Sequence, residues 1–422
     1  MTYQEYPRCG IRRCEGVTAA GLQVFVYPMP EYQTKYAFFA TKYGGCDRRF
    51  QLDGAWTDTP AGVAHYLEHK MFDMPGYNAM ERFTALGASP NAFTSNGMTG
   101  YLFSCTEHFE ENLRELLKYV TTPYFTEESV AKEQGIIGQE IRMGDDNPAR
   151  RVRKNLMRAL YRNHPVQDSI AGTVESIAEI TPEVLHTCHR AFYHPKNMVL
   201  CCAGDIDPER VMKLAELLVP SSKEKVPKRD YGREERPTPE TIRMEEKMAV
   251  SMPVFMLGGK LGWLSDGRAW TKQILLTELG CELFAGEGSP LYSELYAAGL
   301  INSSFYVGAM EFPHGGTVCA GGRCADPSAV LAKLTEAAEE FRMDAAAEGR
   351  LRRLKKTMLG NFVVTLDSAQ ELCHTQADAW FSGFERMEYP ALFDEITPEE
   401  VETVIRESFR PERLALSVIR PL

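Results

Sequence analysis

The feature that most constrains the fold is an internal repeat. Residues 180–200 read ITPEVLHTCHRAFYHPKNMVL and residues 396–416 read ITPEEVETVIRESFRPERLAL, an ungapped match at an offset of 216 residues. In both copies Thr-Pro-Glu is typical of a helix start, with Thr as the N-cap and Pro in the first turn. A later proline ends the helix, and an apolar strand follows. Because the offset is close to half of the 422 residues, the repeat indicates duplication of one domain.

The two copies define how the chain is organised. Residues 219–247 lie between the halves and combine prolines with dense alternating charge, a composition typical of a linker. Each half starts with strand-like segments, such as 24–27 and 36–41, continues with amphipathic helices and ends with the repeated helix and strand. We therefore expect an α+β fold with two homologous domains, residues 1–218 and 248–422, each a mainly antiparallel β-sheet covered by helices.

Composition excludes some classes of function. A net charge of −11 argues against a nucleic-acid partner, and no apolar run approaches the length of a membrane helix. The eleven cysteines are scattered without a C-x-x-C pair, which suits reduced thiols better than a disulfide framework. The first residues lack the apolar core of a signal peptide. We expect a cytoplasmic protein without a membrane partner.

One short motif carries chemistry. Residues 65–69 read HYLEH, and on a helix His65 and His69 lie one turn apart and point the same way, with Glu68 on that side. Two imidazoles at this spacing can bind one metal ion, and the carboxylate can accept a proton from metal-bound water. The alternative is an ordinary helix with two partly buried histidines.

A second segment supplies further carboxylates. Thr126 is a suitable N-cap for a helix that contains Glu133 and Glu140. Both glutamates share a face with the apolar residues Val130 and Ile137. Carboxylates on an apolar stripe are costly unless they are paired or bind a metal. The alternative is that they form salt bridges to arginines such as Arg142 or Arg151.

Together these segments resemble the pitrilysin/insulinase family of zinc peptidases, which includes the mitochondrial processing peptidases. The family pattern is H-x-x-E-H followed after about 70 residues by E-x-x-x-x-x-x-E, and here Glu140 follows His69 by 71 residues. The stretches GVAHYLEHKMF, LGASPNAFTSNGMTGYLF (86–103) and HPVQDSIAGTVESI (164–177) are also similar to the family. The chain looks most like its bacterial small-subunit type of two similar halves.

The resemblance implies a role for each residue. His65, His69 and Glu140 would bind zinc, Glu68 would deprotonate the zinc-bound water, and Glu133 would orient the site. Three protein ligands leave a fourth position open for water, as in catalytic zinc sites. The implied activity is that of a zinc endopeptidase that hydrolyses oligopeptides or unfolded segments.

The second half departs from the first. It contains no H-x-x-E-H, so we expect one zinc per chain. Shifting the motif by the repeat offset lands on Cys281, Phe284 and Ala285. Many family members carry a substrate-gripping Arg and Tyr in the pattern L-R-x-x-x-G-L-x-Y. Here residues 295–302 read LYAAGLIN, with Tyr296 and Asn302 at those places, so Tyr296 is the remaining candidate for a substrate contact.

A hairpin is predicted beside the motif. Residues 91–95 and 98–103 flank Asn96-Gly97, which favours a type I′ turn. If the first strand lies at a sheet edge, an extended peptide could add to it through main-chain hydrogen bonds. The alternative is a hairpin with no role beyond the sheet. The resemblance places Asn91 and Ala92 close to the zinc.

Two other functions stay open. A non-catalytic scaffold or inactive partner subunit could keep the fold, and a metal-dependent hydrolase could act on small molecules. The resemblance also bears on assembly, because family members of double length enclose their substrate between four such domains. It implies that this chain works with a second one, as a homodimer or as a heterodimer with an inactive paralogue.

Overall fold

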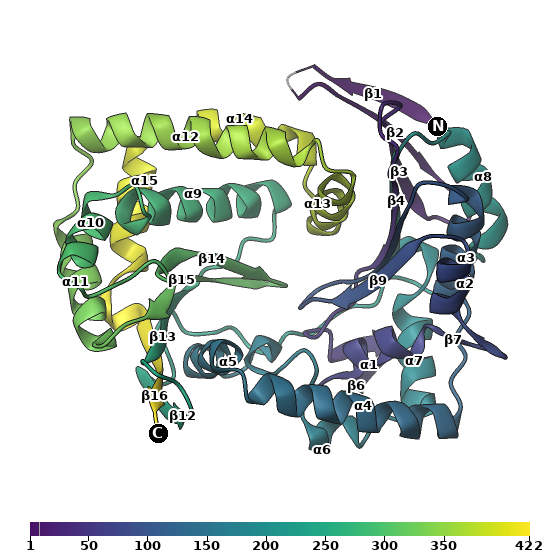
Figure 1. The fold of residues 1–422 in the computed structure, drawn as a ribbon, viewed down its shortest axis with the longest axis horizontal. Coiled ribbons are helices and arrows are strands. Elements are labelled where there is room, and N and C mark those ends of the chain that lie inside the picture. The colour runs from purple at the N-terminus through teal and green to yellow at the C-terminus, as the bar shows by residue number, and fades with distance from the viewer. Residues whose placement is uncertain (8) are drawn as a thin grey trace. The chain divides into compact units, whose positions relative to one another are not determined.

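The computed structural model describes residues 1–7 and 9–422. The chain forms two compact units that do not follow chain order (Figure 1). Unit 1 contains Met1–Ile141, Ser169–Asp230 and Phe362–Met387; unit 2 contains Arg142–Asp168, Tyr231–Asn361 and Glu388–Leu422. The contiguous domains expected from the repeat, 1–218 and 248–422, provide most of units 1 and 2 respectively, and one segment of each half belongs to the other unit.

Unit 1 contains a seven-stranded sheet in the order β1-β2-β3-β11-β4-β10-β9. Its strands are β1 (Thr2–Tyr6), β2 (Ile11–Val17), β3 (Gln23–Pro28), β4 (Lys35–Thr41), β9 (Ser89–Thr94), β10 (Thr99–Cys105) and β11 (Met198–Gly204). Only β3 and β11 pair in parallel; the other neighbours are antiparallel. Two short ribbons pair β5 (Arg49–Leu52) with β6 (Ala55–Asp58) and β7 (Asp73–Met74) with β8 (Tyr77–Asn78).

Helices cover both faces of this sheet (Figure 1). The helices of unit 1 are α1 (Val63–Lys70), α2 (Ala79–Ala85), α3 (Phe109–Thr121), most of α4 (Glu127–Asp145), α6 (Val174–Ile177), α7 (Pro182–Phe192), α8 (Pro208–Leu218) and α13 (Ala369–Ser382), with the 3-10 turn η2 (Pro195–Asn197). Helices α3 and α8 lie on one face and α13 on the other. The apolar stripe of α3, which includes Leu113, Leu116 and Leu117, is completely buried against the sheet.

Unit 2 repeats this plan with a five-stranded sheet in the order β12-β16-β13-β15-β14. Its strands are β12 (Arg243–Met248), β13 (Val254–Leu261), β14 (Tyr306–Phe312), β15 (Gly315–Arg323) and β16 (Leu414–Pro421). Its helices are α5 (Pro148–Leu160), α9 (Gly267–Ala285), α10 (Pro290–Ala297), α11 (Pro327–Glu340), most of α12 (Ala345–Thr365), α14 (Tyr389–Glu395) and α15 (Pro398–Ser408), with η1 (Pro165–Gln167) and η4 (Pro411–Arg413); η3 (Arg386–Glu388) crosses the unit boundary. Again one strand pair, β12 with β16, is parallel. The predicted α+β class and its mainly antiparallel sheets are confirmed.

The repeat corresponds to equivalent elements of the two units. Thr181 and Thr397 cap α7 and α15 through their side chains, and a proline follows each of them in the first turn. Each helix leads through a 3-10 turn into a strand inside the sheet, β11 or β16. The last residues of the predicted linker, from Arg243 onward, belong to β12. In the part of the chain that is described, no helix has both the length and the apolar character needed to cross a bilayer.

Each unit receives a helix from the opposite half of the sequence. Helix α5 packs on β13 and β16 of unit 2, and α13 packs on β4 and β11 of unit 1. A buried polar cluster fixes α13 to its sheet. Gln376 accepts hydrogen bonds from Tyr27 Oη at 2.6 Å and Arg13 at 3.1 Å, and Arg13 also pairs with Glu385 at 2.9 Å. Because Arg13 is almost fully buried, its charge depends on these partners.

The hairpin of β9 and β10 is present, but the predicted turn type is wrong. A type I′ turn needs positive φ at both central residues, and neither Asn96 nor Gly97 has it. The loop is shaped by its neighbours instead. The N–H groups of Gly45 and Cys46 donate to the carbonyls of Ser95 and Asn96, each at 2.9 Å. A side chain at Gly44 would clash with the loop, since its Cβ would lie 2.5 Å from the Gly97 nitrogen.

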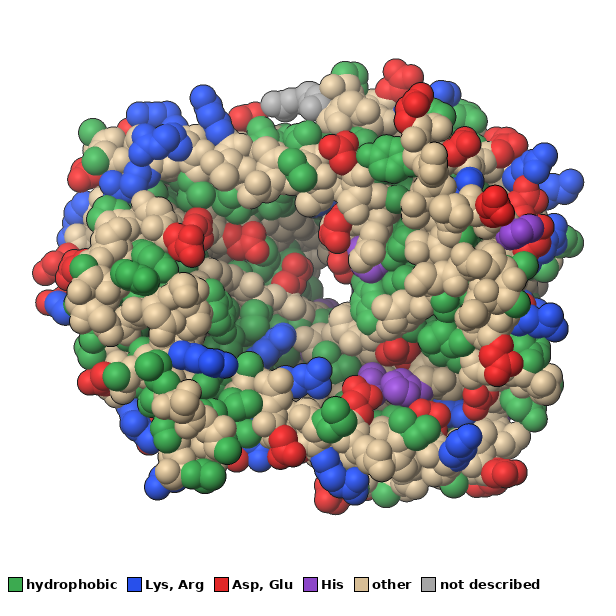
Figure 2. Space-filling view, in the orientation of Figure 1, with side chains coloured by type: hydrophobic (Ala, Val, Ile, Leu, Met, Phe, Trp, Pro, Cys, Tyr) green, Lys and Arg blue, Asp and Glu red, His purple; other side chains and the backbone are tan. Residues whose placement is uncertain are grey.

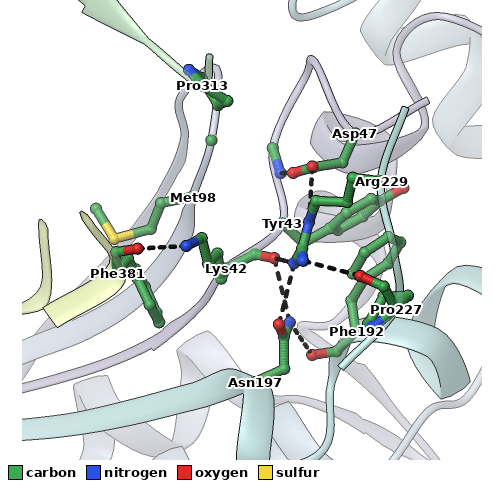
Figure 3. A network of polar contacts seen from close by, with 12 residues as sticks. Lys42, Tyr43, Asp47, Met98, Phe192, Asn197, Pro227, Arg229, Pro313 and Phe381 are labelled. Carbon is green, nitrogen blue, oxygen red and sulfur yellow. Dashed lines mark hydrogen bonds and ion pairs between the residues drawn. The ribbon is translucent and has the colours of Figure 1, made fainter. Parts of the chain in front are cut away.

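The chain after α8 anchors residues 44–47, which support the β9–β10 loop (Figure 3). Arg229 pairs with the fully buried Asp47 at 2.9 Å, and donates to Asn197 Oδ1 at 3.0 Å and to the carbonyl of Lys42. Asp47 in turn accepts the Gly44 N–H at 2.8 Å. The Arg229 cluster therefore fixes the segment on which the β9–β10 loop rests.

Candidate metal centre

Helix α1 begins where only glycine fits. Gly62 precedes the helix with a φ of 100°, a left-handed conformation that disfavours other residues. A Cβ at this position would also lie 2.7 Å from the carbonyl oxygen of Ala171. The Ser176 hydroxyl donates to the Ala61 carbonyl at 2.7 Å, so the segment around 171–176 fixes the start of α1.

Two side chains of α1 set its register against α4. Tyr66 donates its hydroxyl to the Val130 carbonyl, and Lys70 donates to the Ser129 carbonyl at 3.2 Å. Both are almost fully buried, and Lys70 also forms an ion pair with Asp73. A buried ammonium needs such partners. These bonds hold the first turn of α4 against α1, and later turns of α4 bring Glu133 and Glu140 to the histidines.

The three candidate ligands converge. His65 Nε2 and His69 Nε2 each lie 3.7 Å from Glu140 Oε2, and one atom from each side chain lies within 4.8 Å of the other two. Ligand atoms about 2.1 Å from one tetrahedral ion are roughly 3.4 Å apart, so the group fits a metal ion after small adjustments. In the described residues it is the one cluster of this kind. Figure 2 shows histidine side chains at the surface over α1, beside acidic ones.

Glu133 holds one histidine in place. Its Oε1 lies 3.0 Å from His69 Nδ1, which leaves Nε2 to face Glu140. Burial lowers the pKa of His69, but the hydrogen bond to Glu133 and the nearby carboxylates outweigh it, so the net pKa is raised. The same hydrogen bond lowers the pKa of Glu133. The alternative partner Arg151 pairs instead with Asp145 and Glu246.

Glu68 lies next to the ligand group without belonging to it. The residue is 7% exposed, and burial raises its pKa, opposed by a hydrogen bond from Thr94 and by His69. The Thr94 hydroxyl donates to Glu68 Oε2 at 2.6 Å. A buried carboxylate with a raised pKa beside a metal centre has the properties of a general base.

The strand that supplies Thr94 is an edge strand. Strand β9 pairs only with β10 in the sheet, so the edge position on which the peptide-docking prediction depends is present. Asn91 and Ala92 lie on this strand, and the Asn91 side chain accepts the Ala92 N–H at 2.9 Å. An N–H bonded in this way is directed to the open side of the strand.

The remaining candidate lies in the other unit. Tyr296 belongs to α10, is 54% exposed and stacks on Tyr292; the structure does not bring it together with the other candidate residues within one unit. The positions equivalent to the metal motif lie near the end of α9 and are buried: Cys281, Phe284 and Ala285. An apolar helix end thus takes the place of the ligands.

Sequence reasoning missed three residues that shape this centre: Tyr66, Lys70 and Thr94. Tyr66 lies within the motif and Lys70 follows it directly, and nothing in their spacing distinguishes them from ordinary core and surface residues. Thr94 had one available signal. It lies two residues after Ala92, so both share one face of the predicted strand, and the resemblance places Ala92 close to the zinc.

The fold and the geometry of this cluster agree with one family of proteins, and the chain belongs to it: the insulinase family, peptidase family M16. The model of that family matches residues 53–174, and the model described as the inactive domain of the same family matches residues 179–358. The second match includes residues 248–358 of the half without ligands.

Individual relatives support this family assignment. The chain is 35% identical to an uncharacterized zinc protease of Bacillus subtilis, with 95% of both chains covered. The crystal structure of an M16-like peptidase from Alicyclobacillus acidocaldarius is similar over the full length of both chains, with a TM-score of 0.93 and 31% identity. The periplasmic protease PqqL of Escherichia coli shares the fold, with a TM-score of 0.74 and 18% identity, and the chain covers 48% of it.

Proposed function

We propose that this protein is a zinc-dependent endopeptidase that hydrolyses peptide bonds of oligopeptides or unfolded segments. One observation carries the proposal. Helix α1 presents two histidines to Glu140 and, on the same turn, a buried carboxylate that is not a ligand. A structural metal site has no use for Glu68, whereas a hydrolytic site needs such a base.

The residues divide the chemistry between them. His65, His69 and Glu140 would hold zinc, which supplies a Lewis acid that makes water easier to ionise. Glu68 accepts the proton of the attacking water and delivers it to the leaving amine. Glu133 fixes the tautomer of His69, so that Nε2 keeps its lone pair for the metal.

The edge strand explains how a peptide could be held. An extended substrate would add beside β9, and its carbonyl would replace the Asn91 side chain at the Ala92 N–H. Because these bonds involve only the main chain, they would tolerate many side chains. Tyr296 would contribute a further contact from the second half, in place of the family's Arg and Tyr.

The activity is tested by Glu68→Gln. Glutamine keeps the size and can still accept from Thr94, but it cannot take a proton from water. We expect unchanged zinc content and a loss of cleavage of quenched peptides of at least about 10²-fold. The control is Glu81→Gln, the same change at an exposed position of α2. Wild-type activity in the Glu68 variant would exclude its role as the base, and cleavage of small esters but not peptides would favour the small-molecule hydrolase.

A scaffold or inactive partner subunit is the second candidate function, favoured by the half that lacks ligands.

We propose that the active form contains two chains, either identical or one active and one inactive, because PqqL has about twice the matching length. We also propose a cytoplasmic location, because the eleven cysteines are scattered along the chain without a C-x-x-C pair, a pattern that suits reduced thiols. Light scattering tests the assembly: a monomer with full peptidase activity would contradict it.

A further inference from the structure

Thr94 connects two parts of the candidate centre, the edge strand β9 and the Glu68 side chain. Its backbone belongs to the edge strand β9, two residues after Ala92, and its hydroxyl donates to Glu68 Oε2 at 2.6 Å. This distance is within the range of a hydrogen bond to an ionised carboxylate. The strand proposed to receive the peptide thus touches the proposed base directly.

A second threonine lies near this hydrogen bond but does not take the Thr94 proton. Thr99, fully buried opposite Thr94 on β10, donates its hydroxyl to the Tyr43 carbonyl at 2.8 Å. Its single proton is therefore committed. The distance from Thr94 Oγ1 to Thr99 Oγ1 is 3.3 Å, longer than the distance to Glu68, and a neutral hydroxyl is the weaker acceptor. The Thr94 proton therefore goes to the carboxylate.

The hydroxyl is not needed to hold β9 in the sheet. The strand pairs with β10 from Ser89 to Thr94. Next to Thr94, the Phe93 ring stacks on Phe38 on the opposite face, with ring centres 5.8 Å apart. Removing one oxygen from Thr94 leaves these contacts in place, so its main effect falls on Glu68.

We propose that Thr94 is a positioning residue that sets the orientation of the Glu68 carboxylate and ties it to the strand on which the peptide docks. The inference rests on the proposed function for its kinetic consequence. Its geometric content is independent of activity: the hydroxyl determines where Glu68 Oε2 lies. A peptide that pairs with β9 would then be held at a fixed position relative to Glu68 through Thr94 alone.

The geometric test compares crystal structures of zinc-loaded Thr94→Val and Thr94→Ser. Valine keeps the shape and removes the hydroxyl; serine keeps the hydroxyl and removes the methyl group. We expect the Glu68 carboxylate to rotate away from its wild-type position in the valine variant and to keep that position in the serine variant. An unchanged carboxylate in Thr94→Val would overturn the proposal, whatever the activity of the enzyme.

The kinetic test uses the same pair. Thr94→Val should lower kcat for a quenched peptide by about tenfold or more, the effect of a misplaced catalytic group, with KM and zinc content unchanged. Thr94→Ser should recover most of the loss. The matched control is Thr121→Val, which removes a hydroxyl that donates to the Leu117 carbonyl at 2.7 Å on α3.

Each outcome of the kinetic test decides between positioning and structure. A loss of zinc or a rise in KM with unchanged kcat in Thr94→Val, or no recovery by serine, would show a structural role and overturn the proposal. A wild-type enzyme without peptidase activity would refute the proposed function alone, because the position of Glu68 in the two crystal structures still decides the role of Thr94.

Discussion

From the hydrogen bond between Glu133 and His69 we predict how far the affinity for zinc falls when Glu133 is replaced. Glu133 contacts the candidate ligands through His69 Nδ1, at 3.0 Å, and both side chains are largely shielded from solvent. Removing such a partner of a ligating histidine typically lowers metal affinity by 10–100-fold, which corresponds to about 1.4–2.8 kcal/mol. Glu133→Gln should fall near the lower end, because its amide oxygen can still accept from Nδ1. Glu133→Ala, which leaves Nδ1 without a partner, should fall near the upper end.

The assay is zinc competition against a chelator of known affinity, with thermal unfolding of the metal-free protein as a check on folding. Glu128→Gln is the matched control, because it makes the same change at an exposed position of the same helix. If Glu133→Ala bound zinc as tightly as the wild type, His69 would not depend on Glu133 to fix its tautomer.

Two further predictions concern the third ligand and acid stability. Glu140→Gln should lower zinc occupancy strongly, measured by metal analysis after dialysis; full occupancy would remove Glu140 from the ligand set and make Glu133 the candidate. Burial lowers the pKa of His189 to about 4, so the folded state favours the neutral ring. The contribution of this preference to the free energy of unfolding is complete above about pH 6.5 and is lost as the pH falls toward 4. This one group should cost about 2 kcal/mol of unfolding free energy between pH 7 and pH 5, and a urea midpoint that does not change over this range would contradict the assignment.

The parts of the centre that the sequence predicts are those set by spacing along one helix. His65, Glu68 and His69 lie within five residues, so helical geometry alone brings them to one side. Glu133 and Glu140 lie two turns apart on α4, and their common face follows from the same period. The resemblance implied that α1 and α4 lie side by side, but how they pack depends on the hydrogen bonds of Tyr66 and Lys70.

What could not be predicted depends on contacts between distant segments. The Asn96-Gly97 pair favours a type I′ turn in isolation, but hydrogen bonds from Gly45 and Cys46 to the loop carbonyls determine its shape instead. The role of Thr94 follows from the meeting of β9 with α1, which no local pattern encodes. The exchange of α5 and α13 is invisible for the same reason, because an amphipathic helix does not specify which sheet will cover its apolar face.

The position of α13 in the chain has a consequence for biosynthesis. Unit 1 carries every candidate metal ligand, yet one face of its sheet lacks its covering helix until residues 362–387 are made, after most of unit 2. Until then, the faces of β4 and β11 that α13 covers stay open, and Arg13 lacks Gln376 and Glu385. Unit 1 therefore stays unfinished while most of unit 2 is translated, a period in which exposed apolar surface favours aggregation or chaperone binding.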